Sequence, residues 1–255
     1  MSTTHAESAD WLLFGGNKPS ARARLFCFHH AGGAASMYRK WAEEVPPELE
    51  LLAVQLPGRE FRIREKGFTR VEPLVQELLR VLGPFLDRPF AFFGHSMGAT
   101  VGFELARALR RRGERGPAHF GVSGRIAPHL RSRFTPVHEL QDRELVNRLM
   151  KMGGLPEHIL KEPELMALVL PLVRNDYGIV DNYQLVPEPP LACPMTVFWG
   201  HGDIIVSREE AAGWQQHTTG SFSLHGLPGD HFFVGSARRE LQQLLFPELK
   251  QALGQ

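Results

Sequence analysis

The sequence is poor in cysteine, balanced in charge and without any long apolar run. Its 2 cysteines, Cys27 and Cys193, lie inside apolar stretches, which indicates small buried core residues in a reducing compartment rather than a disulfide framework. With 29 basic and 28 acidic residues the formal net charge is +1, which argues against a general nucleic-acid-binding protein. No stretch approaches the roughly 18 apolar residues of a membrane span. We therefore expect neither nucleic acid nor membrane as a partner.

The beginning of the chain is mostly polar. The opening MSTTHAESADWLLFGG lacks a basic region, and its apolar WLLF is too short for the core of a signal peptide. We therefore expect a cytoplasmic protein whose residues 1–23 are loosely ordered and whose first strand begins in the run LFCF.

Short apolar runs rich in Phe, Val and Leu recur along the chain, each ending in a turn or glycine signal. They cover residues 25–33, 51–58, 90–94, 119–124, 195–200 and 222–226. Runs that are apolar on both faces predict buried parallel strands. Helix-like stretches alternate with the first of them, at residues 36–45, 71–86 and 99–113. This alternation predicts an α/β protein with a mostly parallel sheet.

The alternation stops between about Arg133 and Pro190. Here VHELQDRELVNRLMKMGG and EPELMALVLPLVRNDYGIVDNY predict two or three amphipathic helices with no strand between them. An all-helical insertion in an α/β chain is either additional core packing or a lid over a site, and the pattern leaves both open. We expect a single domain over residues 1–255 with this helical subdomain at about 133–190.

A serine flanked by glycines follows the apolar run at residues 90–94. Gly94-His95-Ser96-Met97-Gly98 fits G-x-S-x-G, with a predicted strand before it and a predicted helix after it. In such a nucleophile elbow the serine stands clear of the backbone, and a Cβ at either glycine would crowd the neighbouring chain. The alternative is an ordinary turn serine that bonds to its own backbone. The strand and helix context favours the nucleophile.

A serine nucleophile needs a base, and the base needs an acid that orients it. In this class of fold the acid and then the histidine follow the serine in the chain, each just past a strand. Asp203 follows MTVFWGHG and His231 follows FSLHG, so both meet this order. Asp230 is an alternative acid, but a carboxylate next to His231 in sequence would generally point away from its ring. We interpret the remaining nearby histidines as turn, strand or helix residues: His95, His201, His217 and His225.

The loop HHAGG after the first run supplies a candidate backbone donor for an oxyanion. Its two glycines allow close approach, so the Ala31 N–H can turn inward, while the Met97 N–H begins the helix after the serine. A metal site on His29 and His30 is the alternative. Adjacent strand residues face opposite ways, and no carboxylate or cysteine cluster accompanies this pair. We expect no metal and no cofactor.

Several longer stretches are more specific than G-x-S-x-G. In order and spacing the chain from about Trp11 onward resembles the type II thioesterases, free-standing editing hydrolases of polyketide and nonribosomal peptide synthesis. The stretches that carry this resemblance are LFCFHHAGGAASMYRKW, AVQLPGRE, PFAFFGHSMGA, VSGRIAPH, PLVRNDYGIVDNY and GDHFFV. The resemblance implies an α/β-hydrolase fold with helices on both faces of the sheet and a helical lid. It also implies hydrolysis of acyl thioesters on the phosphopantetheine arm of a carrier protein, which removes misloaded or stalled acyl groups.

The resemblance also assigns the residues of the site. It implies that Ser96 is the nucleophile, Asp203 the orienting acid and His231 the base. It also implies that the backbone N–H groups of Ala31 and Met97 donate to the oxyanion. Two neighbours depart from the family pattern. His29 stands where relatives commonly have proline, and Ile204 follows the acid where proline is frequent. Both put the shape of a loop in question, not the chemistry.

Two further features allow either a functional or a structural interpretation. An apolar acyl slot could be lined by Leu165–Leu172 with Met150, Met152 and Met166, or these residues could simply pack helices together. Two basic runs could dock an acidic carrier protein or be ordinary solvated faces. These runs are Arg59, Arg62, Arg64 and Lys66, and then Arg110–Arg112.

Other functions are compatible with the same triad. They are a general carboxylesterase, an acyltransferase or cyclising enzyme in which an alcohol or amine replaces water, and a noncatalytic module that keeps the fold as an interaction scaffold. The presence of all three triad residue types at strand ends argues against a noncatalytic module.

We expect the protein to be a monomer.

Overall fold

The computed structural model describes residues 10–15, 18, 20–154 and 162–254. Within these residues seven strands form one sheet in the order β1-β3-β2-β4-β5-β6-β7. The β1–β3 pairing is antiparallel and the other pairings are parallel. The strands are β1 Leu12–Leu13, β2 Ala23–Phe28, β3 Leu49–Val54, β4 Phe90–His95, β5 Phe120–Ser123, β6 Met195–Gly200 and β7 Phe222–Leu227.

The parallel part of the sheet contains every strand that the apolar runs predict. The expectation that residues 1–23 are loosely ordered is wrong for the stretch from Trp11 to Leu13. Leu12 pairs with Val54 as the start of the short edge strand β1. The Trp11 side chain is only 5% exposed, and the Arg62 guanidinium lies 4.2 Å from the centre of its ring. Burial of the indole together with this cation–π contact fastens β1 to the sheet.

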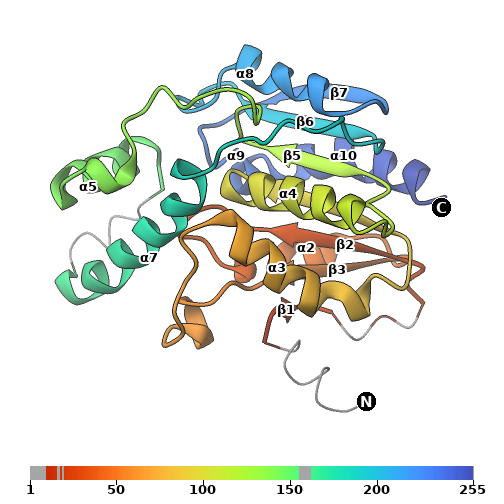
Figure 1. Ribbon diagram of the computed structural model, residues 1–255, viewed down its shortest axis with the longest axis horizontal. Coiled ribbons are helices and arrows are strands. Elements are labelled where there is room, and N and C mark those ends of the chain that lie inside the picture. The colour runs from red at the N-terminus through yellow and green to blue at the C-terminus, as the bar shows by residue number, and fades with distance from the viewer. Residues whose placement is uncertain (1–9, 16–17, 19, 155–161, 255) are drawn as a thin grey trace.

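Helices cover both faces of the sheet. In β2, Phe26 and Phe28 contribute to the core on one face, while Leu25 and Cys27 contribute to the core on the other. Figure 1 shows α3 and α4 in front of the sheet and α2 and α10 behind it. The helices outside the β5–β6 connection are α2 Arg39–Glu44, α3 Val71–Leu82, α4 Met97–Arg111, α8 Arg208–Ala212, α9 Phe233–Ser236 and α10 Arg238–Ala252. Short 3-10 turns lie at η1 Ala35–Tyr38, η2 Glu60–Arg62, η3 Gly83–Phe85 and η5 Gly213–His217.

The connection between β5 and β6 is helical wherever it has regular structure in the described residues. It contains η4 Val137–Glu139, α5 Asp142–Lys151 and α7 Pro163–Asp181. Their apolar faces form a small separate core that includes Leu145, Leu149 and Val173. Figure 1 places α5 and most of α7 beside one end of the sheet. Because this core is distinct from the two that flank the sheet, the segment holds itself together while it contacts the rest of the protein.

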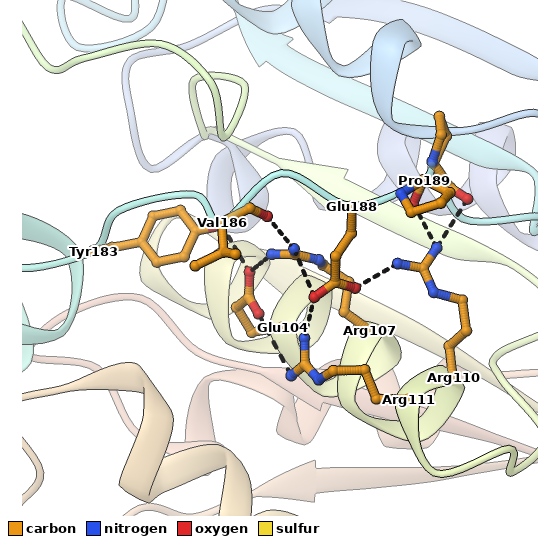
Figure 2. A network of polar contacts seen from close by, with 9 residues as sticks. Glu104, Arg107, Arg110, Arg111, Tyr183, Val186, Glu188 and Pro189 are labelled. Atoms are coloured by element: carbon orange, nitrogen blue, oxygen red, sulfur yellow. Dashed lines mark hydrogen bonds and ion pairs between the residues drawn. The ribbon is translucent and has the colours of Figure 1, made fainter.

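A polar network fastens the chain that returns from α7 to β6 onto α4 (Figure 2). The Tyr183 hydroxyl donates to Glu104 Oε1 over 2.7 Å, and Arg107 donates to Glu104 and to the Val186 carbonyl oxygen. Glu104 and Arg107 are both buried, and each satisfies the charge of the other. A buried charge without a partner would be costly, so this network fixes the path of the returning chain.

The arginines Arg110–Arg112 extend this network. Arg110 and Arg111 donate to the two carboxylate oxygens of Glu188 over 2.6 and 2.7 Å. Arg112 pairs with Glu114 at 3.0 Å. Arg110 and Arg111 therefore hold Glu188, but the side chains of Arg111 and Arg112 remain 47% and 53% exposed, so carrier docking by this run stays a hypothesis.

A buried histidine, His119, lies beside the start of β5. Its ring Nε2 lies 2.9 Å from the Thr196 hydroxyl, and its Nδ1 is buried without a protein partner. Burial lowers the pKa of His119 to about 4. The ring is therefore neutral in the folded protein near pH 7.

We expect His119 to make folding stability depend on pH. An unfolded histidine titrates near pH 6.5, so between there and about pH 4 the unfolded chain binds a proton that the folded chain does not. Stability therefore falls as the pH falls through this window, by up to ~1.4 kcal/mol per pH unit from this group. Urea unfolding at several pH values gives the free energy of unfolding as a function of pH. Between pH 4 and 6.5 this free energy should change less steeply with pH for His119→Phe than for the wild type. Equal slopes would contradict the assignment.

Candidate active site

Ser96 occupies a strained turn between β4 and α4. Its backbone has φ 53 and ψ −115, a region that residues other than glycine rarely adopt. The Ser96 N–H donates to the Ser123 carbonyl oxygen over 2.7 Å, which ties the turn to β5. The Ser96 side chain makes no capping bond to the helix, so the interpretation as an ordinary turn serine does not hold. The hydroxyl instead faces His231.

Both glycines of the elbow are required by close backbone contacts. A Cβ at Gly94 would overlap the Gly98 carbonyl group, and a Cβ at Gly98 would overlap the Phe28 carbonyl oxygen. The turn therefore packs directly against the end of β2, as the motif predicts.

Ser96, His231 and Asp203 form one continuous chain of hydrogen bonds. His231 Nε2 lies 3.1 Å from Ser96 Oγ, and His231 Nδ1 lies 2.8 Å from Asp203 Oδ2. The other carboxylate oxygen, Asp203 Oδ1, accepts the N–H groups of Ile205 and Val206 over 2.7 and 3.2 Å. The side chains of Asp203 and His231 are 0% and 3% exposed. Both carboxylate oxygens are thus engaged, which fixes the plane of the acid against the imidazole ring.

The alternative acid, Asp230, lies in a different setting. Its carboxylate accepts the Phe232 N–H over 2.8 Å within its own loop and is exposed. It bonds to the backbone beside His231 and not to the His231 ring. The structure therefore brings Asp203, and not Asp230, to the histidine.

Two further histidines surround the triad, and burial keeps both of them neutral. His95 Nδ1 lies 2.9 Å from Ser123 Oγ, and its ring centre lies 5.4 Å from that of His231. Burial lowers the pKa of His95 well below its usual value, and burial likewise lowers the pKa of His30 to about 4. Neither ring carries a charge near pH 7 that would repel a proton on His231.

The other histidines considered from the sequence lie away from the serine. His201 packs against Trp199, and His225 stacks against Phe198. His217 Nε2 lies 2.8 Å from His129 Nδ1. Among the residues described here, no group of three or more His, Cys, Asp or Glu side chains is arranged to hold a metal ion.

A cavity of about 240 Å³ opens at Ser96. One side is formed by His30, Ala31, Gly32, His231 and Phe232, and the other by Leu149, Met152, Gly154, Val169, Val173 and Tyr177 of the helical connection. Val169, Val173 and Tyr177 are spaced by four, so they share one face of α7. The walls contributed by α5 and α7 are mainly apolar.

The predicted lining of the acyl slot is therefore only partly right. Met152 and Val169 line the cavity, but Met150, Leu165 and Leu168 are exposed. The prediction misses the large side chains Leu149, Val173 and Tyr177, which also line the cavity from the helical connection. The spacing of four along α7 was the available signal for the last two.

The two predicted oxyanion donors belong to two different segments near the serine. Met97 is the first residue of α4, directly after Ser96, and Ala31 lies in the turn after β2 and lines the same cavity. Among the described residues, no protein acceptor is recorded for the Ala31 N–H. Both amides are thus positioned in the loops that border the serine hydroxyl.

Arg59, predicted as part of a basic docking run, is buried. Its guanidinium donates two bonds of 2.8 Å to the Asp176 carboxylate and one of 2.9 Å to the Gly33 carbonyl oxygen. The side chains of Arg59 and Asp176 are 3% and 1% exposed, and Asp176 also accepts the Gly32 N–H over 2.7 Å. This pair joins α7 to the turn after β2.

The rest of that basic run divides between the interior and the surface. Arg62 is buried and pairs with Glu65 at 2.5 Å, while Arg64 and Lys66 are exposed. The docking hypothesis is therefore wrong for Arg59 and Arg62, because the interior of the protein uses both guanidinium groups.

We expect Gly98→Ala to destabilise the fold. The new Cβ would meet rigid backbone at Phe28, and relieving that overlap requires α4 to move away from β2. The loss in free energy of unfolding should be at least about 2 kcal/mol. Gly116→Ala is the matched control, because a Cβ there meets no atom within 4 Å. Urea unfolding of both variants checks the difference, and equal losses would argue against the close contact.

No helix in the described residues is long and apolar enough to cross a membrane.

Comparison with known proteins identifies relatives over almost the whole chain. Residues 23–246 match the Thioesterase domain family. The chain is 40% identical to the linear gramicidin dehydrogenase LgrE of Brevibacillus parabrevis, over 99% of this chain and 97% of LgrE. The RedJ thioesterase of the prodiginine pathway in Streptomyces coelicolor is 39% identical with a TM-score of 0.86, over 91% of this chain and 92% of RedJ. BorB, the type II thioesterase of the borrelidin biosynthetic cluster, is 36% identical with a TM-score of 0.84, over 94% and 97% of the two chains.

These matches confirm the fold and the family that the motifs predict. The name of LgrE is that of a dehydrogenase, but the matched family and both solved structures are thioesterases. The parallel sheet flanked by helices, with Ser96 at a strand-to-helix turn, agrees with the thioesterases. The chain therefore belongs to the thioesterase family, among the α/β-hydrolase type II thioesterases of polyketide and nonribosomal peptide synthesis.

Proposed function

We propose that this enzyme hydrolyses acyl thioesters carried on the phosphopantetheine arm of an acyl or peptidyl carrier protein, with Ser96 as the nucleophile. The observation that carries this proposal is the hydrogen-bond chain from Asp203 through His231 to Ser96, at the mouth of a mainly apolar cavity. The reaction removes aberrant or stalled acyl groups from the carrier. RedJ and BorB, which belong to pathways of this kind, support the choice of substrate.

The geometry supports a role for each member of the triad in the first half of the proposed reaction. A carboxylate oxygen can only accept, so the proton of a neutral His231 lies on Nδ1 and its Nε2 is free to receive the proton of Ser96. Ser96 Oγ then attacks the thioester carbonyl carbon, and its proton passes to His231. The amides of Ala31 and Met97 donate to the oxyanion. When the tetrahedral intermediate collapses, the thiol leaves with the proton from His231.

The second half repeats these steps with water as the nucleophile. His231 Nε2 accepts a proton from a water molecule, which attacks the acyl-serine carbonyl carbon. The same two amides stabilise the second oxyanion, and the Ser96–acyl bond breaks as His231 returns the proton to Ser96 Oγ. The products are the free acid and the restored serine, and no cofactor enters the balance.

We further propose that the helical subdomain at about 133–190 acts as a lid over the acyl group. Leu149 and Met152 reach the cavity from α5 and the turn that follows it, while Val173 and Tyr177 reach it from α7. Their apolar side chains would exclude water from the bound acyl chain. The proposal includes a monomeric, cytoplasmic enzyme, consistent with two buried free cysteines.

We expect Asp203→Asn to fold normally and to lose most of its activity. Oδ1 of residue 203 accepts two backbone N–H groups, so an asparagine would keep its oxygen there and turn its NH₂ group toward His231. His231 Nδ1 would then have to accept a hydrogen bond from this NH₂ group, so the ring proton would lie on Nε2. A protonated Nε2 cannot receive the proton of Ser96. A loss of about 10⁴-fold in kcat is expected for a triad in the wrong tautomer. Asp230→Asn is the control, since its asparagine oxygen can still accept the Phe232 N–H.

The substrate is tested with a carrier protein loaded with an acetyl or propionyl group, whose release is followed by intact-mass spectrometry. The wild type should unload the carrier and should cleave the thioester faster than the matching oxygen ester. Ser96→Ala should lose roughly 10⁶-fold in rate. If the carrier stays loaded while the ester is cleaved, the enzyme is a carboxylesterase. If the acyl group is recovered on an alcohol or amine instead of as free acid, it is an acyltransferase. Wild-type rates for Ser96→Ala would exclude the serine mechanism.

A further inference from the structure

In the turn after β2 several backbone groups are bonded within the protein, whereas no described residue accepts a hydrogen bond from the Ala31 N–H. The Gly33 N–H donates to the His30 carbonyl oxygen over 3.0 Å, and Gly32 has φ 75. A positive φ at the third residue and this bond between the first and the fourth define a type II β-turn over residues 30–33. The Ala31 N–H belongs to the peptide that links the first two residues of this turn.

His29 makes a second bond to that same peptide. Its Nδ1 lies 2.8 Å from the His30 carbonyl oxygen, and because a carbonyl can only accept, Nδ1 carries the proton. The side chain of His29 is buried, with the residue 2% exposed, and its Nε2 is enclosed without a protein partner. Burial lowers the pKa of His29 well below its usual value, so the ring is neutral and holds a single proton, on Nδ1.

Planarity of the peptide transmits this bond to the oxyanion donor. The His30 C=O and the Ala31 N–H lie on opposite sides of one rigid peptide unit and point in opposite directions. A group that fixes the direction of the carbonyl therefore also fixes the direction of the amide. The Gly33 N–H and the His29 ring hold the carbonyl from two positions, which prevents the peptide from rotating about its flanking bonds.

We propose that His29 is a positioning residue that aims the Ala31 N–H at the oxyanion. This inference rests on the proposed function, in which that amide is one of the two donors.

The remaining peptides of the turn are held by different residues. His30 Nδ1 donates to the Ala31 carbonyl oxygen over 2.9 Å, and Asp176 accepts the Gly32 N–H over 2.7 Å. Arg59 donates to the Gly33 carbonyl oxygen over 2.9 Å. His29 is therefore the side chain bonded to the donor peptide itself, while its neighbours support the rest of the turn.

The test compares His29→Asn with His29→Leu. Asparagine and leucine have the same branched shape, so both lose the same part of the imidazole packing. Only asparagine can place an N–H group, on Nδ2, where the His29 Nδ1 now lies. Steady-state hydrolysis of an acyl-carrier thioester gives kcat and KM for both variants. The affinity for a trifluoromethyl ketone analogue of the acyl group gives a second measurement. Ser96 Oγ adds to the ketone carbon, and the resulting oxyanion lies between the two amides.

We expect His29→Leu to lose about 10- to 100-fold in kcat with little change in KM, less than the 10²–10³ typical for complete removal of an oxyanion donor. Its affinity for the ketone should fall by the same factor. His29→Asn should stay close to the wild type in both measurements. Equal losses in the two variants would show that ring packing matters and not the hydrogen bond. Wild-type values for His29→Leu would also overturn the proposal.

Three controls accompany these variants. His119→Phe removes another buried histidine, which bonds to Thr196 and not to the turn, and should alter stability without lowering kcat. Ser96→Ala is measured in parallel. If it still hydrolyses the thioester, the proposed function fails. If it is inactive while His29→Leu and His29→Asn lose the same factor in kcat, only the role of His29 is refuted. If His29→Leu does not fold, ¹⁵N NMR of the wild-type protein decides the tautomer. A proton on Nε2 of His29 instead of Nδ1 would overturn the proposal.

Discussion

The buried ion pair between Arg59 and Asp176 connects the parts of the protein that the site depends on. Arg59 lies just after β3 and Asp176 lies within α7, and the Asp176 carboxylate also accepts the Gly32 N–H. Three segments that are distant in sequence thus meet at one carboxylate. A buried carboxylate left without its guanidinium costs about 3–5 kcal/mol, so none of these segments can move away alone without a large penalty. The position of α7 and the shape of the turn after β2 are coupled by this contact.

Burial of neutral imidazole rings is the second organising feature. His29 and His30 hold consecutive peptides of the turn through Nδ1, and His95 bonds to the end of β5. Desolvation lowers the pKa of all three rings and so keeps them neutral. The carbonyl acceptors then place the single proton of His29 and of His30 on Nδ1. Positive charges on these rings would also oppose the imidazolium that the proposed reaction forms on His231.

The sequence predicts local features of this fold well and long-range ones poorly. Strands such as 90–94 are buried on both faces, so their composition alone identifies them, and Ser96, Asp203 and His231 follow from their order after strands. The edge strand at Leu12–Leu13 is too short for any periodicity. The pairing of Arg59 with Asp176 crosses 117 positions, and no local pattern distinguishes a buried arginine from a solvated one. For the same reason Arg110–Arg112 resemble a docking surface in the sequence, where nothing shows that Glu188 lies beside them.

The network between α4 and the chain around Tyr183 has a mechanical consequence (Figure 2). Tyr183 and Glu188 anchor the exit of α7 to the helix that begins just after Ser96, and Asp176 anchors α7 itself. Helix α7 is thus fixed to the rest of the protein over its C-terminal half, while its N-terminal half, near Val169, packs against α5 within the helical connection. Bending would widen the outer part of the cavity first, while the walls at Val173 and Tyr177 keep their distance from the serine. Under the proposed function, a longer acyl group would be accommodated by displacement of this half of α7 together with α5, without moving Val173 and Tyr177 away from Ser96.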